Sequence, residues 1–275
     1  MALALAAAAS WGAGDFGGGL ASRRTAVYGV VLLSQLVGFV FAVVVTGVRG
    51  EPVPTGTDVA WSVVAGVLGV TGITALYRGL AVGRMGIVAP VTGVLAAVIP
   101  VTVGIVLQGL PQPLVLVGIG LAIVAVVLVT RVADEGEGRE GLAEALVGGV
   151  AIGLMGVAIA QFSDGVAFGA LSILRVVEAI VMVAVILVTR TDPRPPRAIL
   201  PAILVIGLLD MAGNGFYILA IQAGQLAVAS VLSSLYPVTT VILATLILGE
   251  RVTRDHALGI AVAAAAIVAI GVGSA

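Results

Sequence analysis

The chain is a succession of apolar stretches, each close to the roughly 20 residues that a helix needs to cross a bilayer. Charged and turn-forming residues separate ten such stretches within its 275 residues. Lipid offers the backbone no hydrogen-bond partner, so segments of this length cross it as helices. We therefore predict an all-α integral membrane protein with ten transmembrane helices, at 2–21, 26–48, 58–80, two within 85–130 divided at 109–113, then 143–163, 167–190, 198–221, 226–248 and 256–274.

Composition supports this class and excludes several others. Hydrophobic residues make up 60% of the chain and charged residues 10%, whereas soluble domains carry about 25% charged residues. The chain has no cysteine and a net charge of −1, so we expect no disulfide, no thiolate metal site and no nucleic-acid partner. No metal-binding or phosphate-binding motif occurs, and we predict no cofactor. The first stretch has no basic residue before it, so we interpret it as a membrane span rather than a signal peptide.

The two halves of the sequence repeat. Five pairs of glycines are each 141 residues apart: Gly12 and Gly153, Gly66 and Gly207, Gly72 and Gly213, Gly83 and Gly224, and Gly118 and Gly259. The pattern divides the chain into units 1–131 and 143–275, joined by a polar linker at 132–142. Each unit has five spans, an odd number, so the second must enter the membrane with the opposite orientation. We therefore predict two inverted five-helix repeats, an arrangement typical of secondary transporters.

Arginines are distributed unequally between the two sides of the predicted bundle. Alternate loops, from that containing Arg23 and Arg24 to that containing Arg251 and Arg254, hold 11 of the 13 basic residues. The other side has Arg49 alone, and Arg175 lies within a span. Positively charged loops are retained in the cytoplasm, which places both termini outside the cell membrane.

Polar residues form a stripe on the eighth span. Asp210, Asn214 and Tyr217 are spaced i, i+4 and i+7, so they share one helix face. A carboxylate in the middle of an apolar span is costly, and we interpret Asp210 as the site that couples transport to protons. Asn214 and Tyr217 would then hold substrate. The alternative is that Asp210 makes a structural hydrogen bond to a neighbouring helix.

The ninth span carries a second stripe, of Ser230, Ser233, Ser234 and Pro237. These residues are predicted to form the opposite wall of an intramembrane cavity, and Pro237 to interrupt the helix near a binding site. Serines in membrane helices also serve close helix packing, which is the alternative for all three.

Two further pairs lie on other spans. Trp11 and Asp15 share a face of the first span. Asp15 is interpreted either as a proton- or cation-binding carboxylate in the cavity or as a water-exposed residue on a packing face. Arg175 and Glu178 are three residues apart in the seventh span. We favour an internal ion pair in which each charge neutralises the other, while a pair that opens to bind an anionic or zwitterionic substrate remains the alternative.

Several short motifs carry a family resemblance. The segments 232–237 (Leu-Ser-Ser-Leu-Tyr-Pro) and 248–251 (Leu-Gly-Glu-Arg), together with 10–12 (Ser-Trp-Gly) and 174–176 (Leu-Arg-Val), resemble EamA-type permeases of the drug/metabolite transporter superfamily. The first unit departs from the family pattern, with Gly109-Leu110 in place of Gly-Glu. The family is also often drawn with cytoplasmic termini, which the arginine distribution contradicts. The resemblance implies export or uptake of small organic molecules.

We therefore predict a secondary transporter of the plasma membrane that works by alternating access and uses a proton gradient, and not an enzyme. Its partners would be a small-molecule substrate and the lipid bilayer, with homodimerisation left open. One alternative is an intramembrane enzyme acting on lipid or prenyl substrates, which requires clustered acids or a nucleophile–base pair near one interface. Another is a non-transporting scaffold subunit, which has no need of polar stripes on two spans.

Overall fold

A computed structural model describes residues 2–108, 112–134, 140–222, 233, 235–250 and 254–273 of the chain. This part is helical and contains no strand. It has ten α-helices, one in each of the ten predicted spans. They are α1 (Ala2–Ser22), α2 (Val27–Arg49), α3 (Gly56–Val82), α4 (Met85–Gln108), α5 (Pro113–Asp134), α6 (Leu142–Ile159), α7 (Ala167–Thr189), α8 (Leu200–Gln222, preceded by the 3-10 turn η1, Arg197–Ile199), α10 (Tyr236–Leu248) and α11 (Arg254–Gly273).

Length and composition make this a multi-pass membrane protein. Within the described ranges, α2, α3, α6, α7 and the stretch Arg197–Ala220 are long and apolar enough to cross a bilayer, and α4, α5, α10 and α11 contribute shorter apolar stretches. The outer surface is apolar as well. Val44, Leu187 and Leu246 are each more than half exposed, which suits a lipid environment better than water.

Two boundaries differ from the sequence-based expectation. Helix α5 continues to Asp134, into the predicted linker 132–142, because charged residues such as Arg131 favour helix once the chain leaves the apolar layer. Helix α10 begins at Tyr236, so Pro237 lies in its first turn. A proline there removes no intrahelical hydrogen bond.

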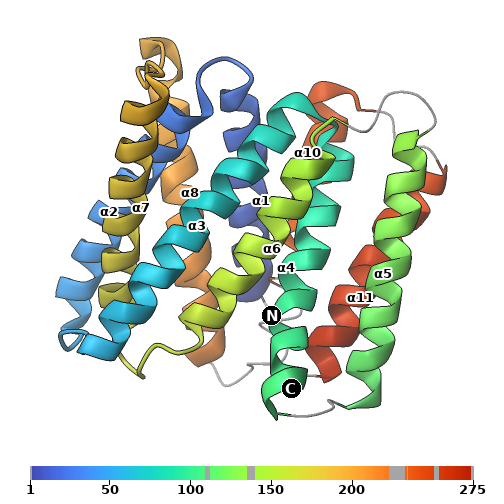
Figure 1. Cartoon of the computed structure of the whole chain (residues 1–275), viewed down its shortest axis with the longest axis horizontal. Helices are drawn as coiled ribbons and strands as arrows, with labels where there is room; N and C mark the ends of the chain where they lie inside the picture. Colours follow the sequence, from blue (N-terminus) through green and yellow to red (C-terminus); the bar gives the residue numbers. More distant parts are fainter. Residues whose placement is uncertain are drawn as a thin grey trace.

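Successive helices run up and down, and the two visible chain ends lie toward the lower half of the view (Figure 1). Helix α1 lies in the middle of the bundle, with α5 and α11 paired at one edge and α2 and α7 at the other. We call the upper end in Figure 1, where Arg23, Arg84, Arg190 and Arg197 lie, the arginine face, and the other end the opposite face.

Glycines allow several of these helices to approach closely. A Cβ at Gly66 of α3 would overlap Leu174 and Val177 of α7, and a Cβ at Gly207 of α8 would overlap Ser34 and Val37 of α2.

A second set of glycine contacts is related in the same way. Gly72 of α3 abuts Ile152 of α6, and Gly213 of α8 abuts Trp11 of α1. In these paired contacts the two partner positions are 140 or 141 residues apart.

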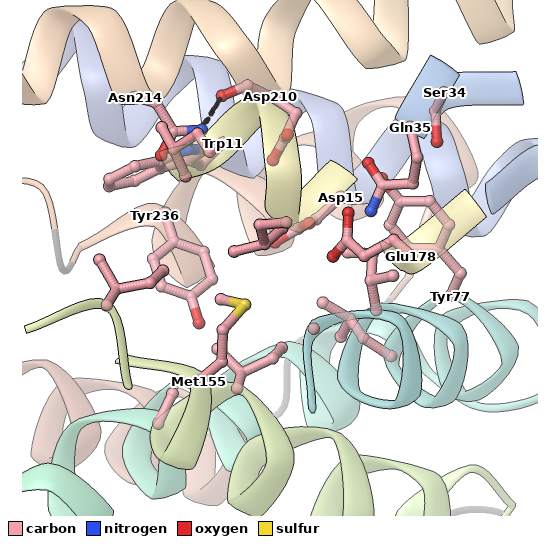
Figure 2. Close-up of a pocket in the computed structure, with 18 of the residues that line it drawn as sticks. Trp11, Asp15, Ser34, Gln35, Tyr77, Met155, Glu178, Asp210, Asn214 and Tyr236 are labelled. Carbon is pink, nitrogen blue, oxygen red and sulfur yellow. Dashed lines mark hydrogen bonds between the residues drawn. The ribbon is translucent and has the colours of Figure 1, made fainter. Parts of the chain in front are cut away.

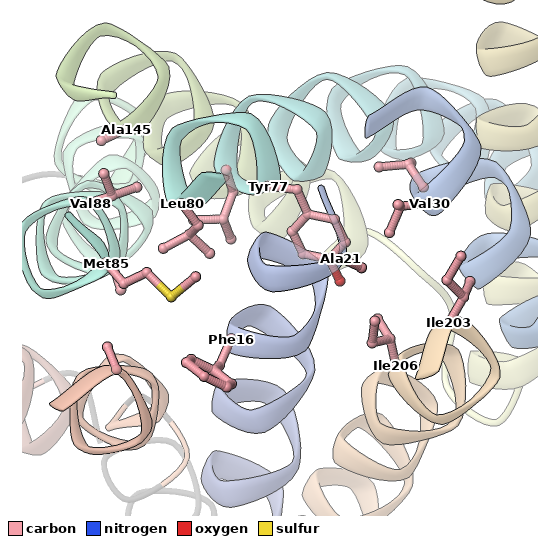
Figure 3. Packing of buried hydrophobic residues seen from close by; sticks show 14 of the residues in the cluster. Phe16, Ala21, Val30, Tyr77, Leu80, Met85, Val88, Ala145, Ile203 and Ile206 are labelled. Carbon is pink, nitrogen blue, oxygen red and sulfur yellow. The ribbon is translucent and has the colours of Figure 1, made fainter. Parts of the chain in front are cut away.

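The largest apolar cluster fills the bundle near the arginine face. Phe16 and Ala21 near the end of α1 are surrounded by Tyr77 and Leu80 of α3, Met85 and Val88 of α4, and Ile203 and Ile206 of α8 (Figure 3). All eight side chains are buried. This packing closes the centre of the bundle at that end.

A candidate substrate cavity

A cavity of about 280 Å³ lies half-way along the bundle. Eight helices contribute to its wall: α1, α2, α3, α4, α6, α7, α8 and α10. Most of the wall is apolar, and four ionisable side chains carry formal charge: Asp15, Arg175, Glu178 and Asp210. Its volume is near the lower end of the range for small-molecule sites, about 300–1,000 Å³.

Arg175 of α7 is the only basic side chain in the cavity wall of the described structure. Its Nη1 donates to the side-chain oxygen of Gln35 at 2.6 Å and to Glu178 at 2.9 Å. Its Nη2 forms an ion pair with Asp210 of α8. The guanidinium therefore joins α2, α7 and α8, and two carboxylates compensate its burial.

Glu178 is 1% exposed and depends on a glycine for its space. A Cβ at Gly69 of α3 would overlap the Glu178 carboxylate and lie 2.9 Å from the sulfur of Met155. The ion pair expected between Arg175 and Glu178 from their spacing is therefore present. It is one part of a larger network that the spacing alone did not reveal.

Asp15 differs from the other two carboxylates. It lines the cavity from α1 and is partly exposed to it. Among the residues that the structure describes, it makes no hydrogen bond and no ion pair. With all groups ionised, the cavity wall holds three negative charges and one positive charge.

Aromatic side chains surround the same end of the cavity. The Trp11 ring is 5.8 Å from Tyr217 and 6.5 Å from Tyr236, the latter in an edge-to-face arrangement. Trp11 Nε1 and Asn214 Nδ2 both donate to the backbone carbonyl of Asp210, at 3.2 and 2.9 Å. In Figure 2, Trp11, Asn214 and Tyr236 lie together, Gln35, Glu178 and Tyr77 lie across the cavity, and Asp15 lies between the two groups.

Comparison with known proteins identifies the second half of the molecule. The model of the EamA-like transporter family matches residues 140–272. This half of the chain belongs to the EamA-like transporter family, within the drug/metabolite transporter superfamily. Members of the family are membrane transporters rather than enzymes. No curated protein matches the sequence.

Six of the predicted site residues meet in the cavity of this EamA-like protein: Trp11, Asp15, Arg175, Glu178, Asp210 and Asn214. Three others lie elsewhere. Tyr217 is absent from the cavity wall and packs against Trp11 instead. Pro237 is buried against Gly93 of α4, and Ser233 is buried. Ser230 and Ser234 lie outside the described residues.

Sequence reasoning did not single out Gln35, Tyr77 or Tyr236, although all three line the cavity. Each is an isolated polar or aromatic residue within an apolar span, and that isolation is the signal that could have found them. Among the described residues, no group of three His, Cys, Asp or Glu side chains could hold a metal ion.

The cavity is closed toward the arginine face by polar contacts as well as by the apolar cluster. The Glu250 carboxylate accepts hydrogen bonds from the backbone N–H groups of Met85 and Gly86, both at 3.0 Å. Arg23 lies 3.7 Å from the same carboxylate and donates to the Leu80 carbonyl. These contacts join the ends of α1, α3 and α10 to the start of α4.

Toward the opposite face the cavity extends further. Ile159, the last residue of α6, and Leu171, in the second turn of α7, both belong to its wall. The described structure is therefore closed at the arginine face, and its cavity reaches toward the opposite one.

Proposed function

We propose that this EamA-like chain is a proton-coupled secondary transporter that carries a small organic molecule through the central cavity by alternating access. The observation that carries the proposal is a mid-membrane cavity with ionisable side chains from α1, α7 and α8. Ionisable residues at this depth are expensive and usually mark transport pathways or proton relays.

The proposal includes two inverted five-helix units. The glycine contacts support it, because the contact of Gly66 with α7 and that of Gly207 with α2 relate positions about 141 residues apart. The contacts of Gly72 with Ile152 and of Gly213 with Trp11 do the same. Matching contacts give the two units similar packing, so a closure at one face has a counterpart at the other.

Alternating access then requires the arginine face to open. The contacts of Glu250 with Met85 and Gly86 would have to break, and the apolar side chains around Phe16 would have to separate. By the positive-inside rule we assign the arginine face to the cytoplasm, with both termini outside. The described state would accordingly be open to the outside.

Proton coupling would act through the carboxylates. When Asp210 is ionised it joins α8 to Arg175 of α7, and when it is protonated the attraction between those helices is lost. A proton exchanged at Asp210 therefore changes how two helices of the cavity wall are held together. Asp15, without such a partner among the described residues, is the second candidate for the exchange.

Cysteine accessibility tests this proposal without a known substrate. The chain has no cysteine, so Ala97→Cys places a single thiol in the cavity wall. Ala65→Cys, at a buried position outside that wall, is the matched control. A membrane-impermeant thiosulfonate is added to sealed vesicles of either orientation.

We expect the Ala97 variant to react from both sides, more slowly from the arginine face, and the Ala65 variant to remain unreacted. Reaction from one side only, at every pH between 5.5 and 8.5, would show a cavity that does not alternate.

A further inference from the structure

We propose that the molecule carried in this cavity is an organic monocation, an ammonium group on an apolar body, whose charge is held by Asp15 between the faces of Trp11 and Tyr236. The inference rests on the proposed transport function and adds the chemical class of its substrate. It depends on the balance of charge in the cavity, on the partners of each charge, and on the position of the aromatic rings.

The charge balance excludes anions. One guanidinium and three carboxylates face the cavity, so its ionised wall has a net charge of −2. An anionic substrate would increase that imbalance in a region of low dielectric constant, whereas a monocation would reduce it. The same reasoning disfavours a carboxylate-bearing substrate, unless a second basic group compensates for it.

Arg175 is already engaged. Its two terminal nitrogens contact Gln35, Glu178 and Asp210, and a Cβ at Gly38 would lie only 3.3 Å from its Nε. A substrate carboxylate would have to displace one of these protein carboxylates from a buried position. Arg175 is therefore a structural counterion for the wall rather than an anion-binding residue.

Asp15 is the carboxylate that remains for a substrate. It faces the cavity and has no hydrogen bond or ion pair within the described part of the chain. The groups around it leave it without a counterion. Helix α8 presents Asp210, α10 presents Tyr236, and α3 presents Tyr77, while Gln35 of α2 is uncharged and Arg175 and Glu178 of α7 are paired with each other. A bound cation would supply the missing positive charge.

The aromatic rings favour a particular kind of cation. Trp11 lies one helical turn before Asp15, on the same face of α1. The Tyr236 ring stands edge-on to it, with the ring planes 81° apart, and the two rings form adjacent walls. Aromatic faces attract desolvated cations, above all substituted ammonium groups. The rest of the wall, including Ile152, Met155 and Leu171, is apolar and suits a hydrocarbon body.

Since a proton and a cation would both neutralise Asp15, they should compete for it. Competition of this kind gives exchange of protons for the substrate, so that a proton gradient drives the cation in the opposite direction. The coupling proposed above and the substrate class then arise from the same carboxylate.

The test uses phenyltrimethylammonium and its neutral isostere tert-butylbenzene, with benzenesulfonate as the anion. Calorimetric binding to the purified full-length protein is measured for each. We expect the cation to bind at least tenfold more tightly than the other two compounds. Asp15→Asn should weaken the cation at least tenfold and leave the isostere unaffected, while Asp192→Asn, which removes an exposed loop carboxylate, should change neither. Trp11→Leu should weaken the cation by about threefold to thirtyfold.

The unaltered protein provides a second measurement in case Asp15→Asn does not fold. Cation affinity should fall as the pH is lowered from 8.5 to 5.5, approaching tenfold per pH unit where one proton is displaced. Equal affinity for the cation and its isostere, tighter binding of the sulfonate, or a cation affinity independent of pH overturns the inference. If these occur while Ala97→Cys still reacts from both sides, the substrate class is wrong and the transport function stands. If the cation binds as expected while Ala97→Cys reacts from one side only, the site is right and the transport function fails.

Discussion

Arg175 of α7 and Asp210 of α8 form an ion pair across the wall of the central cavity. Glu178 holds the same guanidinium from the other side, at 2.9 Å. Asp210 is the more accessible of the two carboxylates, with 30% of its side chain exposed against 1% for Glu178. The pair thus combines a buried, permanent contact with one that water and protons can reach from the cavity.

Asp210→Asn keeps the shape of the side chain and removes its charge. We expect the variant to fold and to bind substrate, but to lose accumulation against a gradient and the response to a pH step. Reconstituted flux at pH 6 and pH 8, measured with phenyltrimethylammonium, checks this. Undiminished pH-driven flux would remove Asp210 as the coupling site and leave Asp15 in that role.

Glu178→Gln should destabilise the fold, because it leaves a buried guanidinium with one carboxylate fewer. Losing one partner of a buried pair costs about 3–5 kcal/mol. Asp210 retains its contact with Arg175, so we expect the lower end of that range. Replacing both Arg175 and Glu178 by leucine should recover much of the loss in Tm. If the double variant folds but transports nothing, the pair has a functional role beyond structure.

Gly69→Ala tests the space reserved for Glu178. The added methyl group would overlap the carboxylate and approach Met155, and we expect a loss of about 1–3 kcal/mol from overpacking. Gly215→Ala on α8 is the matched control, since nothing lies within 4 Å of its added methyl. A helical glycine replaced in open space should raise stability by about 0.5–1 kcal/mol. Equal Tm values for the two variants would contradict the packing described for Glu178.

Glu250→Gln should weaken the closure at the arginine face. The amide can accept one of the two backbone hydrogen bonds but loses the charge that attracts Arg23 and the helix N-terminus. A loss of about 1 kcal/mol corresponds to roughly fivefold faster labelling of Ala97→Cys from that face. Glu51→Gln is the control, because Glu51 makes the comparable contacts with Phe168 and Gly169 at the opposite face. Faster labelling from the arginine face in both variants would mean general loosening.

The distribution of arginines predicts the orientation of the protein. A reporter fused after Ala275 should be active only as an extracytoplasmic enzyme, such as a phosphatase that requires disulfides. Strong activity of a cytoplasmic reporter at the same position would reverse the assignment, and the described state would then be open to the cytoplasm.

The sequence alone determined the class, the helices and the family. Apolar length and the spacing of charges located one helix in each predicted span, because a bilayer imposes a minimum length on every segment that crosses it. The motifs around Pro237 and Glu250 indicated an EamA-type chain, and the family match covers them. Local spacing also predicted the contact of Arg175 with Glu178, since residues three apart are neighbours on a helix.

Only the tertiary structure decided which distant residues meet. Arg175 contacts Gln35, 140 residues away, and Asp210, 35 residues away, and no helical periodicity encodes those distances. The same limit applies to Tyr217, which shares a stripe with Asp210 yet packs against Trp11, and to Tyr77, which reaches the cavity because Gly18 leaves room for its ring. A helix stripe specifies a direction from its own axis. What lies in that direction depends on how closely the neighbouring helices can approach, and here glycines on several helices set that approach.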